Sequence, residues 1–208
     1  MTTVALFGAS GRTGTRVLSR LLARGDRVQA LVRDPARLAP HPRLVVGAGD
    51  ARDTAAVTAT LAGSEAVVVA LGLADISQPT TAFSDAVRTI VAAMREGGPR
   101  RILAIASAGA LPDARGGLRS DHAPPGPFTH IGAEHARNWR TLADSGLAWT
   151  LICPVDLVDL PEGRARTAYE ALPAGGSQTG YEDLATAMVA LLDDRGSHGR
   201  RVGIVSAA

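Results

Sequence analysis

Short apolar runs that alternate with helix-period segments constrain the fold of this chain more than any other feature. Residues 66–71 read Ala-Val-Val-Val-Ala-Leu, with no polar residue on either face of the strand that they predict. A strand that is apolar on both faces belongs in a parallel sheet covered by helices on both sides. Because strand and helix patterns alternate over nearly all 208 residues, we expect one α/β domain spanning 1–208, with a doubly wound parallel sheet.

The spacing of apolar residues predicts seven strands and five helices. The strands are expected at 4–7, 28–32, 44–46, 66–71, 102–106, 149–152 and 202–205; the first helix ends at Gly25, and the others span 54–61, 82–94, 129–143 and 182–192. Segments 110–127 and 155–180 have no readable period, although 173–176 is compatible with a hairpin turn. Both follow strand ends, where ligands bind in such sheets, so we expect them to form a substrate rim; plain surface loops are the alternative.

A glycine triplet lies between the first strand and the first helix. Residues 8–14 read Gly-Ala-Ser-Gly-Arg-Thr-Gly, a variant of the dinucleotide-binding fingerprint. The first glycine allows a tight turn, the second lets the backbone approach a pyrophosphate, and the third lets the helix pack closely on the strand. The helix N-terminus then offers free N–H groups to the phosphates. The loop residues expected to bind the cofactor are Gly8, Gly11, Arg12, Thr13 and Gly14.

The end of the second strand bears on the choice of cofactor. NAD-selective folds place an acidic residue there to bind the ribose 2′-hydroxyl, but here the first charged residue is Arg33, with Arg37 close behind. A guanidinium matches a 2′-phosphate, and Arg12 could converge on the same group. We therefore predict NADPH over NADH, with Asp34 leaving weaker NADH binding open. The alternative is that Arg33 pairs with Asp34 or faces solvent.

Residues after the third and fourth strands are also predicted to line the cofactor site. Asp50, followed by Ala51, is placed to accept a hydrogen bond from the adenine amino group; an N-cap role for Asp50 or Asp53 is the alternative. Leu71 and Gly72 close the fourth strand, and a glycine there would let the backbone pass close to the cofactor.

The composition excludes several classes of function. All 22 basic residues are arginine, so there is no Schiff-base lysine, no Walker-type lysine and no Tyr-x-x-x-Lys pair. Scattered arginines and 3% aromatic residues argue against nucleic-acid binding, and no apolar run approaches the roughly 20 residues of a membrane span. The histidines lack metal-ligand spacing, so no metal is expected. We expect a cytoplasmic monomer or homodimer that acts on a small molecule.

Without a Tyr/Lys pair, Ser107 and His135 are the remaining catalytic candidates. His135 shares a helix face with Ile131, Asn138 and Leu142, which predicts that it points inward. A structural histidine and a strand-end serine cap are the alternatives. Asp156 lies at the rim, where a turn role is equally open, and Cys153 is expected to be a buried hydrophobe. The expected substrate contacts are Ala110, Leu111, Asp156 and Leu157. Pro154 and Ser107 are expected beside the cofactor, where Ser107 could hydrogen-bond either the substrate or the nicotinamide.

Residues 8–14, 31–38 and 102–107 resemble the atypical short-chain dehydrogenase/reductases of the NAD(P)H-binding, NmrA-like group. Within that group the chain is most similar to the biliverdin reductase B (flavin reductase) type. The resemblance covers nearly the whole chain and implies a Rossmann-like fold. It also implies NADPH as hydride donor to flavins, quinones or tetrapyrrole-like acceptors.

The resemblance further implies roles for single residues. Arg33 and Arg37 match the family's 2′-phosphate contacts, and Ser10 stands where the family often has a threonine beside the phosphates. Ser107 matches the serine at the end of the fifth strand, and His135 matches a histidine on the following helix. This chain departs from the family at Asp156, where a second histidine is usual, and in segment 110–127.

Three functions remain open from the sequence. The leading one is an NADPH-dependent reductase acting on a small planar or carbonyl acceptor. The second is an NADP(H)-sensing regulatory protein without turnover, since NmrA-like proteins include such members. The third is a redox-neutral isomerase or dehydratase that uses the cofactor transiently.

Overall fold

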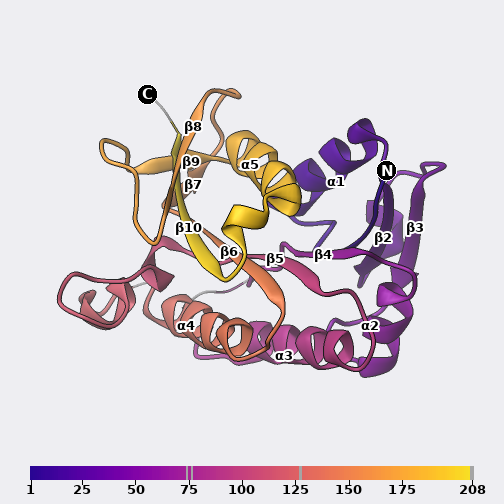
Figure 1. The fold of residues 1–208 in the computed structure, drawn as a ribbon, viewed down its shortest axis with the longest axis horizontal. Coiled ribbons are helices and arrows are strands. Elements are labelled where there is room, and N and C mark those ends of the chain that lie inside the picture. Colours follow the sequence, from indigo (N-terminus) through magenta and orange to yellow (C-terminus); the bar gives the residue numbers. More distant parts are fainter. Residues whose placement is uncertain (74, 76, 127, 207–208) are drawn as a thin grey trace.

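Eight strands form one sheet in the order β3-β2-β1-β4-β5-β6-β10-β8, and β7 and β9 form a small second sheet (Figure 1). The computed structural model describes residues 1–208 except 74, 76, 127 and 207–208. The strands are β1 Thr3–Phe7, β2 Arg27–Val32, β3 Leu44–Ala48, β4 Ala66–Val69, β5 Arg101–Ile105, β6 Ala148–Pro154, β7 Asp156–Val158, β8 Ala165–Tyr169, β9 Gln178–Gly180 and β10 Arg200–Ser206. The α-helices are α1 Arg12–Arg24, α2 Thr54–Leu61, α3 Ala82–Arg95, α4 Thr129–Ala143 and α5 Tyr181–Asp193.

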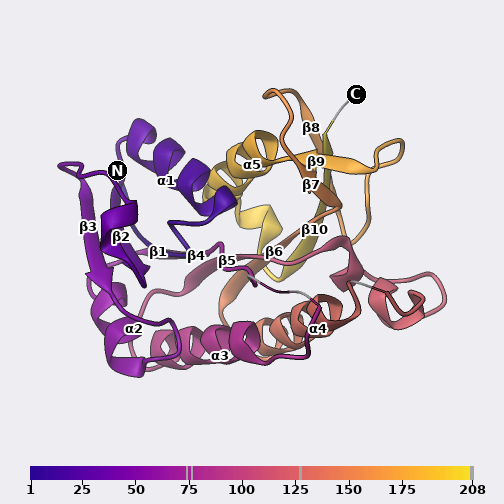
Figure 2. The same ribbon diagram turned by 180° about the vertical axis from the view of Figure 1, so that it is seen from behind.

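The sheet separates two hydrophobic cores, which explains why its strands lack alternating polarity. Successive β1 side chains point to opposite faces. Val4 and Leu6 join the core under α1 and α5, while Ala5 and Phe7 join the core under α2, α3 and α4. Figures 1 and 2 show these two helix layers on either side of the sheet. The predicted doubly wound α/β fold is confirmed, and none of the described helices is long and apolar enough to cross a membrane.

The strand order reverses beside β1. The chain proceeds from β1 to β2 and β3 on one side, then returns to place β4 on the other side of β1. The loops that leave the carboxyl ends of β1 and β4 therefore diverge, and a dinucleotide binds in such a crevice in doubly wound folds. The glycine turn that follows Phe7 lies at this point.

Segment 155–180 is more ordered than its sequence predicts. β7 pairs in parallel with β9, and β8 pairs in antiparallel with β10 at the sheet edge. A hairpin centred on 173–176 is therefore wrong, because β8 and β9 pair with other strands. The sequence of β8, Ala-Arg-Thr-Ala-Tyr, has no apolar run, since as an edge strand it is largely solvent-exposed.

Arginines occupy every fourth position of α1 and form a stripe along one face of the helix. The stripe faces α5 and the loop after β7. Its ion pairs with these two elements are Arg12–Asp159 at 2.7 Å, Arg16–Asp159 at 3.3 Å, Arg16–Glu182 at 2.7 Å, Arg20–Glu162 at 2.9 Å, Arg20–Glu182 at 2.7 Å and Arg24–Asp193 at 2.8 Å; Arg24 also pairs with Asp26 at 2.6 Å. We call the four arginines, Arg12, Arg16, Arg20 and Arg24, the α1 arginine stripe.

Candidate functional site

The glycine turn after β1 leaves no room for side chains. Gly8 has a φ of +90°, and a Cβ on it would lie 2.5 Å from the carbonyl oxygen of Ala70, just past β4. A Cβ on Gly14 would lie only 1.9 Å from the carbonyl oxygen of Gly8. The first and third glycines therefore bring β1, β4 and the start of α1 into backbone contact, as the spacing predicts.

The N-terminus of α1 is open to an anion. Gly11 is the N-cap residue and has no side chain to bind the first free N–H groups, and the first turn contains no acidic residue. Ser10 is half-buried beside this turn and Thr13 is buried within it. Bare glycine backbone followed by uncapped N–H groups suits a pyrophosphate. The residues present therefore fit a dinucleotide cofactor.

Arg33 and Arg37 remain available for a phosphate. Both are exposed, and neither forms an ion pair within the described part of the chain. Asp34 does not pair with Arg33: its carboxylate accepts a hydrogen bond from the backbone N–H of Ala36 at 3.1 Å and caps a short 3₁₀ turn, Pro35–Arg37. Two guanidinium groups without an ion-pair partner among the described residues thus follow β2.

The side chain of Arg12 does not point where the sequence predicts. Its guanidinium does not converge with Arg33 but forms an ion pair with Asp159, and it lies 4.2 Å from the centre of the Tyr181 ring. The spacing of the motif places Arg12 in the loop, but the direction of its side chain depends on a partner that lies 147 residues away.

Asp50 is already engaged by a neighbour. Its carboxylate accepts hydrogen bonds from the backbone N–H of Arg52 at 2.9 Å, from Nε at 2.9 Å and from Nη2 at 2.7 Å. These hydrogen bonds lower the pKa of Asp50 to about 2. Asp53, not Asp50, caps α2 by accepting from the N–H of Ala55 at 2.9 Å. Ala51 is half-buried and packs on the core beneath α2.

The backbone after β4 passes the glycine turn. Leu71 is half-buried and packs against the core, while Gly72 is exposed. A Cβ on Gly72 would meet nothing within 4 Å, so no protein contact requires glycine there.

Ser107 and His135 are brought together. Ser107 follows β5, and its Oγ lies 2.9 Å from Nδ1 of His135 on α4. His135 is buried, and its ring meets that of Phe83 edge-on at 5.7 Å between centroids. Burial lowers the pKa of His135 to about 4, with Glu134 opposing the shift. The imidazole is therefore neutral near pH 7, and it acts as a hydrogen-bond partner of Ser107 and not as a cation.

The predicted rim residues differ in exposure. Asp156 is exposed and Leu157 is half-buried on β7, whereas Pro154 is buried at the end of β6. Ala110 and Leu111 have 1% and 0% of their surface exposed, so the structure places their side chains in the core rather than on the rim. Cys153 is fully buried, and burial raises the pKa of its thiol. Within the described residues no group of His, Cys, Asp or Glu side chains is arranged to bind a metal ion.

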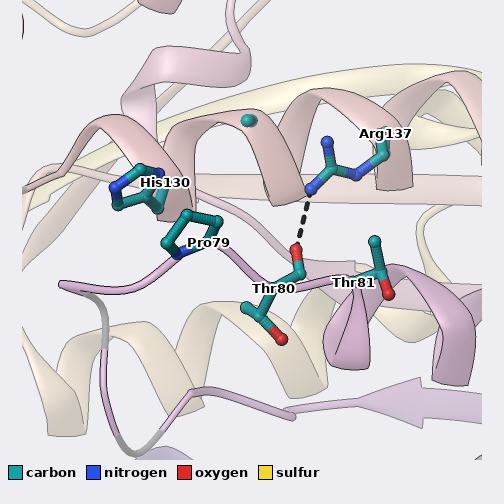
Figure 3. A pocket seen from close by; sticks show the side chains of 6 residues that line it. Pro79, Thr80, Thr81, His130 and Arg137 are labelled. Atoms are coloured by element: carbon teal, nitrogen blue, oxygen red, sulfur yellow. Dashed lines mark hydrogen bonds between the residues drawn. The ribbon is translucent and has the colours of Figure 1, made fainter.

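A hollow of about 420 Å³ lies elsewhere, between α4 and the segment that leads into α3 (Figure 3). It is lined by Pro79, Thr80, Thr81, His130, Ala133 and Arg137. Arg137 is already bound to the buried Glu134 and to the Thr80 carbonyl oxygen. Because neither Ser107 nor His135 lines this hollow, we do not take it as the substrate site.

Sequence reasoning missed Phe83, Arg52 and Asp159, which contact His135, Asp50 and Arg12 respectively. Of these three contacts, only the one between Asp50 and Arg52 could have been predicted from the local sequence. An aspartate two residues before an arginine can bind both its backbone N–H and its guanidinium. The other two contacts join segments that are distant in sequence.

Comparisons with known proteins bear on the family and the fold of the chain. A family model described as NAD(P)H-binding matches residues 8–195. A candidate exported protein from Burkholderia pseudomallei is 27% identical, with 99% of this chain and 100% of that chain covered and a TM-score of 0.82.

Two further solved structures share the fold at lower identity. A candidate NADH-flavin reductase from Streptococcus pneumoniae is 21% identical, with 100% of both chains covered and a TM-score of 0.82. A short-chain dehydrogenase/reductase from Veillonella parvula, solved in complex with NADP, is 18% identical over 100% of this chain and 95% of that chain, with a TM-score of 0.78. With the family model matched over most of its length, the chain belongs to the NAD(P)H-binding family, and the resemblance to atypical short-chain dehydrogenase/reductases is confirmed.

Proposed function

We propose that the protein is an NADPH-dependent reductase that transfers hydride to a small planar or carbonyl acceptor such as a flavin or a quinone. The observation that carries this proposal is the hydrogen-bonded pair of Ser107 and His135. The pair follows β5, at the same carboxyl edge of the sheet as the glycine turn, with β4 between β5 and β1. A polar pair at the same edge of the sheet as a cofactor loop can position an acceptor.

NADPH, when bound, supplies the hydride. The chain supplies a hydrogen bond to the acceptor atom on which negative charge develops. When Nδ1 of His135 carries the hydrogen and donates to Ser107 Oγ, the Ser107 hydroxyl is free to donate outward. Because His135 is buried and uncharged, it fixes this orientation without adding a positive charge. His135 therefore positions Ser107, which contacts the acceptor.

Preference for NADPH is supported by the two guanidinium groups after β2. Arg33 and Arg37 are exposed and have no carboxylate partner in the described part of the chain, so a 2′-phosphate would gain two charge-assisted contacts. Asp34, the acidic residue nearest to the end of β2, caps the following turn instead of standing free for a ribose hydroxyl. The NADP complex of the Veillonella protein supports the same choice.

A cytoplasmic location is also part of the proposal. The only cysteine, Cys153, is buried and free, which suits a reducing compartment. Fractionation of cells that express the tagged full-length protein would test it.

The test follows NADPH absorbance at 340 nm with a panel of flavins, quinones and dichlorophenolindophenol. We expect turnover, and we expect Ser107→Ala and His135→Ala to lower kcat by roughly 10- to 100-fold, as the loss of a hydrogen bond to a charged group would. The Kd for NADPH should stay within about threefold, since neither residue lies in the phosphate site.

Other results would redirect the assignment. Wild-type turnover in both variants would remove the pair from the mechanism. Tight NADPH binding with no turnover on any acceptor would favour a sensor. Product formed without net loss of NADPH would favour an isomerase or a dehydratase.

A further inference from the structure

Arg52 is held in one orientation at the end of β3. The two oxygens of Asp50 accept hydrogen bonds from Nε and Nη2 of Arg52, and the Arg52 backbone N–H donates to the same carboxylate. Such a fork binds one edge of the guanidinium in its own plane. The side chain of Arg52 is nevertheless 55% exposed, so a large part of it is accessible to a ligand, and the flat faces of the guanidinium lie outside the plane of the fork.

This arginine lies next to the residues that would bind the ribose. β2 and β3 pair in parallel with Val32 opposite Ala48, and the N–H of Gly49 donates to the carbonyl oxygen of Val32 at 2.9 Å. Arg33 and Asp50 therefore leave the sheet side by side. The charge of Arg33 contributes to the low pKa of Asp50, which places the two groups within electrostatic reach.

The neighbourhood offers no Phe, Tyr or Trp ring, and Arg52 is the guanidinium there that a carboxylate already holds in place. The sequence contains no Phe, Tyr or Trp between Phe7 and Phe83, a stretch that supplies all of β2, β3 and their loops. An adenine ring bound here can stack only on aliphatic groups or on a guanidinium plane. Elsewhere this chain uses arginines in that way, with Arg201 lying 4.5 Å from the Trp139 ring centre.

We propose that Arg52 is the stacking platform for the adenine ring of the cofactor and that Asp50 is the residue that positions it. Asp50 already accepts three hydrogen bonds, which occupy most of its acceptor capacity, so its main partner is Arg52 rather than the adenine amino group. Asp50 also neutralises the charge of Arg52, which leaves Arg33 and Arg37 as the cations for a 2′-phosphate. The inference rests on the family's cofactor binding and not on turnover or on NADPH preference.

The test is a set of binding titrations on the full chain, read by calorimetry with NADPH, NADH and reduced nicotinamide mononucleotide, which lacks adenine. The variants are Arg52→Leu, which removes the plane, and Arg52→Lys, which keeps the charge without the plane. Arg115→Leu is the matched control, because Arg115 is bound by Asp113 in the same way, with its N–H at 2.9 Å and its Nε at 2.8 Å.

We expect both Arg52 variants to raise the Kd of NADPH and of NADH by the same roughly three- to fivefold, the range of an exposed stacking contact of a cation. The Kd of the mononucleotide and the affinities of Arg115→Leu should not change. Asp50→Asn should weaken both dinucleotides in the wild-type chain and add nothing in an Arg52→Leu background.

Full affinity in Arg52→Lys, or a loss confined to NADPH, would show that Arg52 acts by charge and would overturn the proposal. An equal loss for the mononucleotide would overturn it as well, since that ligand has no adenine. A wild-type protein that binds cofactor but reduces no acceptor would contradict the proposed reductase while leaving this inference standing.

Discussion

Acidification should cost this fold free energy through His135. Its pKa in the folded protein is about 4, against an ordinary value of 6.5, because burial opposes the charged imidazolium. Above pH 6.5 neither the folded nor the unfolded state binds this proton. As the pH falls below 6.5, the unfolded chain binds the proton first, so stability is lost progressively until the pH reaches about 4. The full loss is about 3 kcal/mol, of which about 2 kcal/mol falls between pH 7 and pH 5.

The measurement is urea unfolding of the wild type and of His135→Gln at both pH values. Glutamine does not titrate, so the variant should lose about 2 kcal/mol less than the wild type between pH 7 and pH 5. Carboxylates contribute equally to both proteins and cancel in the comparison. His122→Gln, which removes an exposed histidine from the 110–127 segment, is the control and should follow the wild type.

Parallel pH dependence in the wild type and His135→Gln would refute the reasoning. That result would mean that His135 is hydrated or can move into solvent when it is protonated. It would also remove the argument that a neutral imidazole orients Ser107, because that argument depends on the same burial.

Three further predictions concern other residues. Asn138→Leu should stabilise the protein by about 1–2 kcal/mol in urea unfolding, because both side-chain polar atoms of Asn138 are buried without a partner among the described residues; a loss of stability would instead indicate a buried water bound to the amide. Gly14→Ala should destabilise by roughly 1–3 kcal/mol and weaken cofactor binding, since its Cβ would lie 1.9 Å from the Gly8 carbonyl oxygen; wild-type melting and affinity would contradict the turn geometry. Arg33→Ala should raise the Kd of NADPH by roughly 10- to 100-fold and that of NADH by less than about twofold; equal affinity of the wild type for both cofactors would end the NADPH assignment.

The sequence predicts this fold well where local pattern and tertiary environment agree. The helices at 54–61 and 129–143 have the predicted bounds. Asp53 caps the start of the first, and the second buries the face that carries His135, Asn138 and Leu142. The fourth strand is predicted to reach residue 71 but ends at Val69. The apolar run continues past the strand because Ala70 is buried and Leu71 packs on the core, where their backbone passes close to Gly8.

Prediction fails where a residue's position depends on a distant partner. β8 joins the sheet only because β10, more than thirty residues later in the chain, offers a free edge. Arg12 belongs to the glycine loop by its position, yet the acidic loop after β7 determines its direction. The Ser107–His135 pair is an intermediate case. Helix periodicity predicts that His135 points inward, but only the fold shows that Ser107 lies within hydrogen-bond distance of its Nδ1.

The α1 arginine stripe has a mechanical consequence. The guanidinium of Arg16 binds two carboxylates at once, and so does that of Arg20. Asp159, Glu182 and Glu162 are therefore all bound to the same helix, α1. The N-terminus of α1 is the uncapped helix end beside the glycine turn. A point-like ammonium could not bridge two anions with fixed geometry in the same way. The loop after β7, which we propose borders the acceptor, therefore cannot shift without straining or breaking contacts to the helix that we propose binds the phosphates, and high salt should loosen these contacts.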